Sequence, residues 1–280
     1  MRSSTPSSRG PAASTTLVLR LRPSRARARR LAVAEAVSLL RDLDAAPARG
    51  GPFGSEPRVV WVTVPTASLD DVVARLPRLG YTVAVDTAEE RLYEEDAEAA
   101  RDEAVDRRAF RIRTSAGVRE VVGYRGDGSD GAKRGLAVPD ARLLANLARS
   151  DDEGLVLDPF AGAGGVVREL ELALSADVDA VVAPGLHDLS GRHIIASADA
   201  LPFADGSLAG AATEPPFDEA ADGVVVAALR ECLRVVAPGG RIAVMAPARQ
   251  VTAMRQVRRP VLEEPVDRKG LPVTVAVWEV

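Results

Sequence analysis

The sequence predicts an α/β protein in two parts, a small N-terminal α/β unit and a larger C-terminal unit with a doubly wound, mostly parallel sheet. The second half of the 280-residue chain alternates apolar strands with helices, which is typical of a parallel sheet covered on both faces. A Gly/Ser/Asp-rich run precedes that pattern and lacks any apolar residue. We therefore expect a disordered tail at residues 1–15, the small unit at 16–125, a linker at 126–133 and the larger unit at 134–280.

The N-terminal unit is predicted from short periodic segments. Residues 16–22 alternate apolar and polar side chains as a strand does, and Ser68 precedes a helical segment with acids in its first turn. In order, the predicted elements are a strand at 16–22, a helix at 27–43, a strand at 58–65, a helix from Ser68, a charged helical segment at 89–108, and a hairpin of 110–113 and 119–124. Six arginines lie within residues 20–30, and they are either phosphate contacts or the solvated face of a helix.

The C-terminal unit is predicted as alternating strands and helices that end in a hairpin. Its turn at residues 267–270 reads Asp-Arg-Lys-Gly and gives the sheet one antiparallel edge strand. In order, the predicted elements are a strand at 155–157, a helix at 165–174, strands at 179–183, 193–196 and 209–213, a helix at 224–236, a strand at 241–246, and closing strands at 258–266 and 271–280.

Composition excludes several classes of function. No apolar run approaches the eighteen or more residues of a membrane span, and the Ser/Pro/Arg-rich start has no apolar stretch of a secretory signal, so we expect a cytoplasmic protein without membrane contacts. The single cysteine, Cys232, lies within an apolar helical pattern, as a core side chain does. The only histidines are His187 and His193, which supports neither a metal site nor a Ser-His-Asp triad. We therefore expect an organic cofactor.

The turn after the first C-terminal strand is the most informative segment. Residues 154–165 read GLVLDPFAGAGG, an apolar strand with Asp158 at its end and then glycines leading to a predicted helix. Gly162 and Gly164 allow a ligand to approach the backbone, and Asp158 can accept a hydrogen bond from an ammonium group. A structural turn or a dinucleotide site would have a similar sequence.

Two later strands also end next to acids. Asp199 follows the 193–196 strand, where it either accepts from an adenine amino group or is an ordinary loop acid. The strand at 209–213 continues into Glu214, Pro215, Pro216 and Phe217. The prolines stiffen that turn and remove two N–H donors, so we expect carbonyls and Glu214 to face the cleft as acceptors for an amine, with Phe217 stacking on a base. The alternative is a rigid surface turn with a capping Glu.

The order of these segments, with LRVVAPGGRIAVM after them, resembles class I S-adenosylmethionine-dependent amino-methyltransferases, whose catalytic turn has the form D/N/S-P-P-Y/F. Residues 134–148 resemble the helix before the glycine turn in the THUMP-linked tRNA guanine-N2 methyltransferase family. The resemblance implies a Rossmann-like fold, S-adenosyl-L-methionine as cofactor, tRNA or another structured RNA as partner, and methyl transfer to an exocyclic amino group, namely guanosine N2. The implied catalytic residues are Glu214, Pro215, Pro216 and Phe217, and the implied cofactor-binding residues are Asp158, Phe160, Gly162, Gly164, Asp188 and Asp199.

The sequence departs from the family pattern at several points. Glu214 stands where the family usually has Asp, and one methylene moves the carboxylate by about a bond length. The predicted second strand at 179–183 ends without the usual acid for the ribose hydroxyls, so we assign that role to Asp188. Residues 185–192 are too few for a full crossover helix, and residues 16–125 hold only one small unit, which is not a complete THUMP module.

These departures leave two other functions open. One is a DNA adenine or cytosine amino-methyltransferase, which uses a similar turn and flips its base out of the duplex. The other is a catalytically inactive RNA-binding protein that retains the fold.

Overall fold

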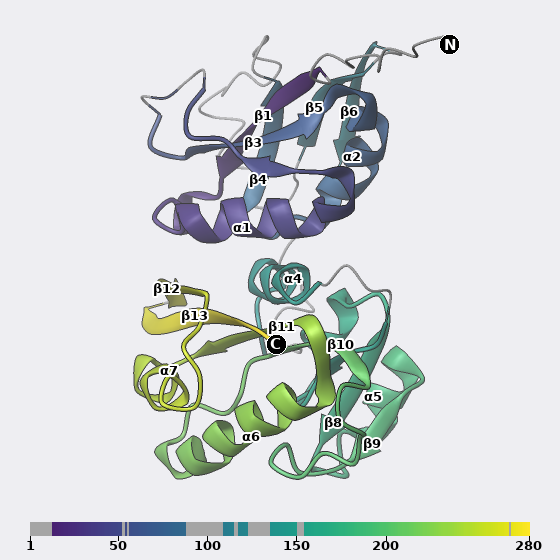
Figure 1. Ribbon diagram of the computed structural model, residues 1–280, viewed down its shortest axis with the longest axis vertical. Helices are drawn as coiled ribbons and strands as arrows, with labels where there is room; N and C mark the ends of the chain where they lie inside the picture. The colour runs from purple at the N-terminus through teal and green to yellow at the C-terminus, as the bar shows by residue number, and fades with distance from the viewer. Residues whose placement is uncertain are drawn as a thin grey trace, which may run out of the picture.

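A computed structural model describes residues 13–51, 54, 56–87, 109–114, 117–122, 135–149, 154–268 and 270–280. The predicted linker and the charged segment at 89–108 lie outside these residues, as does most of the predicted tail, whose last residues belong to the first strand. Figure 1 shows an N-terminal part with its own sheet and a C-terminal part with a second sheet, and helix α4 lies between them.

The N-terminal part is built on a four-stranded sheet in the order β2-β3-β1-β4. Its pairs are antiparallel, and a separate antiparallel hairpin of β5 and β6 confirms the predicted one. The sequence reading missed β4, whose run TVAVDT is short and is followed by the charged segment. The strands are β1 Ser14–Leu21, β2 Ala46–Pro47, β3 Val59–Pro65, β4 Thr82–Thr87, β5 Ala109–Thr114 and β6 Gly117–Val122; the helices are α1 Arg29–Leu39 and α2 Leu69–Arg75, with short 3-10 turns η1 Pro23–Arg25, η2 Arg41–Leu43, η3 Thr66–Ser68 and η4 Leu76–Arg78.

The C-terminal part is a seven-stranded sheet in the order β12-β13-β11-β10-β7-β8-β9. Strands β7 to β11 are parallel, and β13 is antiparallel to both of its neighbours, so the predicted antiparallel strand lies one place in from the edge. The strands are β7 Val156–Asp158, β8 Ala173–Asp177, β9 His193–Ile195, β10 Leu208–Thr213, β11 Val236–Ala246, β12 Leu262–Arg268 and β13 Leu271–Glu279; the helices are α4 Val138–Leu147, α5 Ala183–Ser190, α6 Asp222–Val235 and α7 Ala248–Met254, with 3-10 turns η6 Val167–Glu169 and η7 Glu219–Ala221.

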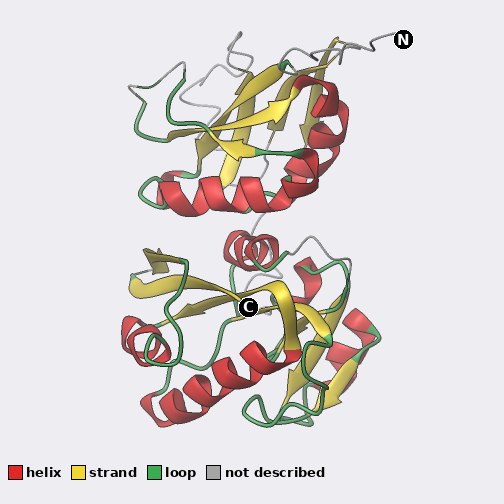
Figure 2. Cartoon of the chain, viewed as in Figure 1, coloured by secondary structure: helices red, strands yellow, loops and turns green. Residues whose placement is uncertain are grey.

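The sheet is doubly wound because the chain moves outward from β7 in both directions, through β8 and β9 on one side and β10 and β11 on the other. Helices cover both faces (Figure 2). On β11, Ala243 and Met245 join the core that includes α4, whereas Ile242 and Val244 join the core that includes α6 and α7. In such a sheet the ligand lies beyond the carboxyl ends of the strands where the winding reverses, here β7 and β10.

Two predicted elements near that point are wrong. Residues 165–174 contain only the short turn η6 followed by the start of β8, and residues 179–183 are a loop that leads into α5. The cause is composition: β8 reads ALSAD, whose small buried residues carry a weak strand signal, whereas Val178 and Val181 resemble a strand but are 73% and 85% exposed. Residues 185–192 were expected to be too few for a crossover helix, but α5 provides a short one between β8 and β9.

The two parts share one hydrophobic core, and α4 packs against α1. At this interface the buried Glu35 carboxylate accepts hydrogen bonds from the Gly80 and Tyr81 amides, at 2.5 and 3.1 Å, and from Asn146 Nδ2 at 2.9 Å. A Cβ at Gly80 would lie 2.1 Å from the carbonyl oxygen of Pro139, so only glycine permits the approach.

Among the described residues, none of the helices combines the length and apolar character needed to cross a membrane.

Candidate active site

Asp158 ends β7 and is 2% exposed. Its Oδ1 accepts hydrogen bonds from Thr213 Oγ1 at 2.7 Å and from the Phe160 amide at 3.3 Å. Burial raises the pKa of Asp158 to about 7, the two hydrogen bonds oppose that rise, and the charge of Asp177 adds to it. Asp158 therefore braces the turns after β7 and β10, and it titrates near neutral pH.

The glycine turn after β7 has two glycines with separate roles. Gly162 and Gly164 have φ angles of 47° and 78°, in the left-handed region that favours glycine. A Cβ on Gly162 would meet no described atom nearer than 4.0 Å, so open space lies in front of its backbone. A Cβ on Gly164 would lie 2.5 Å from Leu189, so that glycine is needed for packing against α5. Phe160, between them and Asp158, is half-buried against the core that includes α6.

Asp177 is a candidate site residue that the sequence pattern did not predict. It ends β8, and its Oδ2 accepts a hydrogen bond from the Gly162 amide at 2.7 Å, which joins it to the glycine turn. Asp188 was assigned this role only because the second strand was placed too late in the sequence. In the structure Asp188 is exposed on α5, whereas Asp177 is the acid at the end of the second strand.

Asp199 follows β9 and is exposed. Its Oδ1 accepts a hydrogen bond from the Ser197 hydroxyl at 2.5 Å. Its assignment as an adenine contact stays a prediction.

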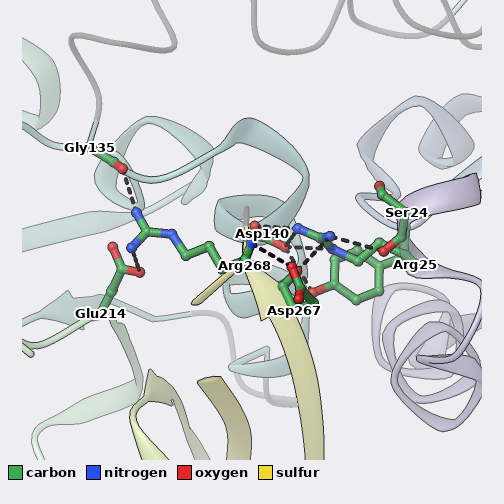
Figure 3. A network of polar contacts seen from close by, with 9 residues as sticks. Ser24, Arg25, Gly135, Asp140, Glu214, Asp267 and Arg268 are labelled. Carbon is green, nitrogen blue, oxygen red and sulfur yellow. Dashed lines mark hydrogen bonds and ion pairs between the residues drawn. The ribbon is translucent and has the colours of Figure 1, made fainter. Parts of the chain in front are cut away.

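Glu214 directly follows β10 and points toward Arg268 from the end of β12 (Figure 3). Arg268 Nη1 lies 2.9 Å from Glu214 Oε1, and their side chains are 20% and 15% exposed. The angles of this ion pair are not those of a hydrogen bond, and Oε1 has no hydrogen-bond partner among the described residues. Burial raises the pKa of Glu214 to about 7; Arg268 lowers it, and the charges of Asp140 and Asp158 raise it further.

The rest of this turn is held rigidly. The Pro216 carbonyl accepts a hydrogen bond from Gln250 Nε2 at 2.9 Å, and the Phe217 carbonyl accepts one from Arg249. These two carbonyls are therefore already used, contrary to the expectation that they face the cleft as acceptors. Pro215 is buried, and Phe217 is half-buried with the Arg268 guanidinium carbon 5.6 Å from its ring centroid.

Arginines of residues 20–30 contact other residues of the protein. Arg20 pairs with Glu56 and Asp86, and Arg25 pairs with Asp140. Two further arginines of the run make internal contacts, Arg29 with the Pro57 carbonyl and Arg30 with Glu264. Arg20 and Arg25 are thus largely buried in their ion pairs, whereas the Arg30 side chain is 68% exposed and pairs with Glu264 at the surface.

The arrangement joins Asp158, Asp177 and Glu214 at the carboxyl ends of three neighbouring strands. No cluster of His, Cys, Asp and Glu suited to a metal ion occurs in the described part of the chain. Carboxylates beside an open glycine turn suit a ligand that offers N–H and O–H donors, and they disfavour a pyrophosphate.

The strand order and the glycine turn at its reversal define the Rossmann-like fold of class I methyltransferases. TrmN from Thermus thermophilus shares this fold over 95% of the present chain and 99% of its own, at a TM-score of 0.52 and 19% sequence identity. Geranyl diphosphate C-methyltransferase from Streptomyces coelicolor, solved with S-adenosyl-L-homocysteine, covers 50% of the present chain and 76% of its own, at a TM-score of 0.41 and 12% identity. No protein-family model and no curated protein matches the sequence.

Proposed function

We propose that the protein transfers a methyl group from S-adenosylmethionine to an exocyclic amino group of a nucleic-acid base, and that the base is guanosine N2 in tRNA. The observation that carries the proposal is Glu214 Oε1, an acceptor without a hydrogen-bond partner among the described residues, at the carboxyl end of β10 and next to the switch point of the sheet. An amino group that donates to this oxygen satisfies it.

The residues around the glycine turn fit the cofactor. Open space in front of Gly162 admits a ligand to the backbone, and Asp177, fixed by the Gly162 amide, can accept from ribose hydroxyls. Asp199 is the proposed partner of the adenine amino group. When bound, S-adenosylmethionine supplies an electrophilic methyl group on a positively charged sulfur.

The chain's own residues hold and align the target amine. Glu214 accepts one N–H, which turns the nitrogen lone pair toward the methyl carbon, while Phe217 stacks on the base. The nitrogen–methyl bond forms as the sulfur–methyl bond breaks and its electron pair stays on sulfur. The nitrogen then loses a proton, and Glu214, whose pKa is about 7, can take it up.

RNA is proposed as the substrate because the likeness to TrmN extends over both parts of the chain, and because the sequence resembles THUMP-linked tRNA guanine-N2 methyltransferases. The N-terminal part, fused to the other through a shared core, extends the surface available to a macromolecular substrate.

Calorimetric titration with S-adenosylmethionine tests the cofactor site. Asp177→Ala should weaken binding at least tenfold, because it removes acceptors from the ribose position and frees the glycine turn, since a hydrogen bond to a charged group is worth about 1.5–3 kcal/mol. Asp188→Ala is the matched control on exposed α5 and should bind as the wild type does. Absence of binding to the wild type would refute the proposal.

Transfer of a tritiated methyl group then tests the substrate. The wild type should label tRNA and leave duplex DNA unlabelled, and nuclease digestion should release N2-methylguanosine. Labelling of duplex DNA alone would favour a DNA amino-methyltransferase, and cofactor binding without labelling of either would favour an inactive binding protein.

A further inference from the structure

Arg268 occupies the two positions that the proposed function assigns to the target base. Its guanidinium carbon lies 5.6 Å from the Phe217 ring centroid, where a base would stack, and its Nη1 lies 2.9 Å from Glu214 Oε1, where the amine would donate. Its Nη2 donates to the Gly135 carbonyl at 2.5 Å (Figure 3). A base can therefore reach the turn only when this side chain moves aside.

The main chain next to Arg268 is held by contacts of Asp267. Arg25 Nη1 donates to the Asp267 carbonyl at 3.0 Å, and Arg25 makes a two-pronged contact with buried Asp140, with three N–O distances between 2.8 and 3.1 Å. The Asp267 carboxylate also accepts from the Gly270 amide at 2.8 Å, which closes the turn after β12. Displacement of Arg268 is therefore a rotation of its side chain about a fixed backbone.

A space for the displaced guanidinium lies on the side toward the N-terminal part. A cavity of about 320 Å³ is lined by Arg25, Asp140, Asp267 and Arg268, among others. Arg25 is paired with the buried Asp140, whereas Arg268 is paired with Glu214 and can exchange this partner for an incoming anion.

A phosphate is the anion that a nucleic-acid substrate brings next to its base. Arginine binds phosphate through two parallel N–H···O bonds, whereas its present contact with Glu214 Oε1 is a single ion pair of 2.9 Å. The exchange also uncovers Phe217 and returns Glu214 Oε1 to the substrate amine. Binding of the phosphate and opening of the base position are thus one event.

We propose that Arg268 is a specificity-determining residue that restricts the site to bases carrying a neighbouring phosphate, because the phosphate must draw Arg268 away from Glu214 and Phe217 before a base can enter. The inference rests on the proposed function and deepens it. Polynucleotides are accepted and free nucleosides are excluded.

The test compares methylation of tRNA and of free guanosine by the wild type, Arg268→Ala and Arg268→Gln. For guanosine, kcat/KM should rise on the order of tenfold in both variants because the base position is open; for tRNA it should fall on the order of tenfold because the phosphate contact is lost. The assays are run at pH 8.5, so that Glu214 stays ionised without its neighbouring cation. Arg255→Ala is the control, because it removes an exposed arginine that is paired with Glu263. It should leave kcat/KM unchanged for both tRNA and guanosine.

Each outcome separates the inference from the proposed function. Opposite changes for the two substrates support the inference, and Arg268→Gln keeps a hydrogen-bond donor for Gly135 should Arg268→Ala fold poorly. Equal losses for tRNA and guanosine, or an unchanged ratio, would overturn the inference while the wild-type activity on tRNA still supports the proposed function. A wild type that neither binds S-adenosylmethionine nor methylates tRNA would overturn both.

Discussion

Replacing Asp158 with Asn should abolish a pH dependence of stability that the structure predicts. The pKa of Asp158 is raised by burial from 3.8 to about 7 in the folded protein. Folding therefore favours the protonated acid, and that contribution is fully present below pH 3.8 and is lost as the pH rises to about 7. The difference of about three pKa units corresponds to about 4 kcal/mol, without correction for solvent because the residue is buried.

Other groups do not reverse this slope. The raised pKa of Glu214, from 4.5 to about 7, contributes to the slope with the same sign. Arg75 lowers the pKa of Asp42, and Arg234 lowers the pKa of Glu231. A carboxyl group with a lowered pKa stabilises the folded protein above its ordinary pKa, and this stabilisation is lost only as the pH falls below that value. Between pH 4 and pH 7 the slope therefore comes from Asp158 and Glu214, and comparison of the wild type with Asp158→Asn isolates the contribution of Asp158.

Urea unfolding followed by circular dichroism measures the effect. From pH 5 to pH 7 the wild-type free energy of unfolding should fall by about 2 kcal/mol more than that of Asp158→Asn, since each unit is worth about 1.4 kcal/mol and the folded-state carboxyl is half ionised at pH 7. The amide oxygen of Asn still accepts from Thr213 and Phe160, so the fold should persist. Asp188→Asn, the same change at an exposed position, should keep the wild-type slope. Equal slopes for the wild type and Asp158→Asn would refute the reasoning.

Three further substitutions test the interface and the turn. Arg25→Ala should lower the free energy of unfolding by about 3–5 kcal/mol, because it leaves the buried Asp140 carboxylate without its cation; Asp140→Asn in the same chain should recover part of that loss in urea unfolding. Gly80→Ala should destabilise the protein by about 1–3 kcal/mol or more, since its Cβ would collide with backbone across the interface, and an unchanged melting temperature would contradict the packing described. Gln250→Ala should lower kcat by about 100-fold with intact cofactor binding, because it releases the Pro216 carbonyl and lets the turn shift; a change confined to KM would assign Gln250 another role.

Local sequence signals predicted where a strand ends in a turn wherever one segment carries the whole feature. The glycine turn and the Glu214-to-Phe217 turn each follow directly from a strand, so residue type and order were enough. The second strand was predicted too late in the sequence, so the acid at its end was not identified. The cause is that β8 consists of small residues, whereas Val178 and Val181 have the composition of a strand but are exposed. Strand prediction from sequence depends on the alternation of apolar and polar residues, and a strand made mainly of Ala and Ser shows little contrast between them.

Contacts between distant segments could not be predicted. Arg268 lies 54 positions after Glu214 and Arg25 lies 115 before Asp140, and neither spacing has a periodic signature. For the arginine-rich run, the sequence suggested either phosphate contacts or a solvated helix face. Neither alternative included the contacts that Arg20, Arg25, Arg29 and Arg30 make with other residues of the protein. Charge patterning along the sequence does not show which cations a tertiary fold neutralises.

The same long-range contacts explain why the two parts function as one body. The core formed by α1, α4 and the C-terminal sheet is continuous, and Arg25, from the N-terminal part, holds the Asp267 carbonyl immediately before Arg268. Arg25 is itself oriented by Asp140 and by the face of Tyr81, 5.3 Å from its guanidinium carbon, and the Tyr81 hydroxyl donates to Asp140 at 2.9 Å. Since Asp140 belongs to α4, the N-terminal part fixes both the helix before the glycine turn and the strand end that carries Arg268. Residues distant in the sequence therefore set where Arg268 stands relative to Glu214, and the geometry of the Glu214-to-Phe217 turn depends on both parts of the chain.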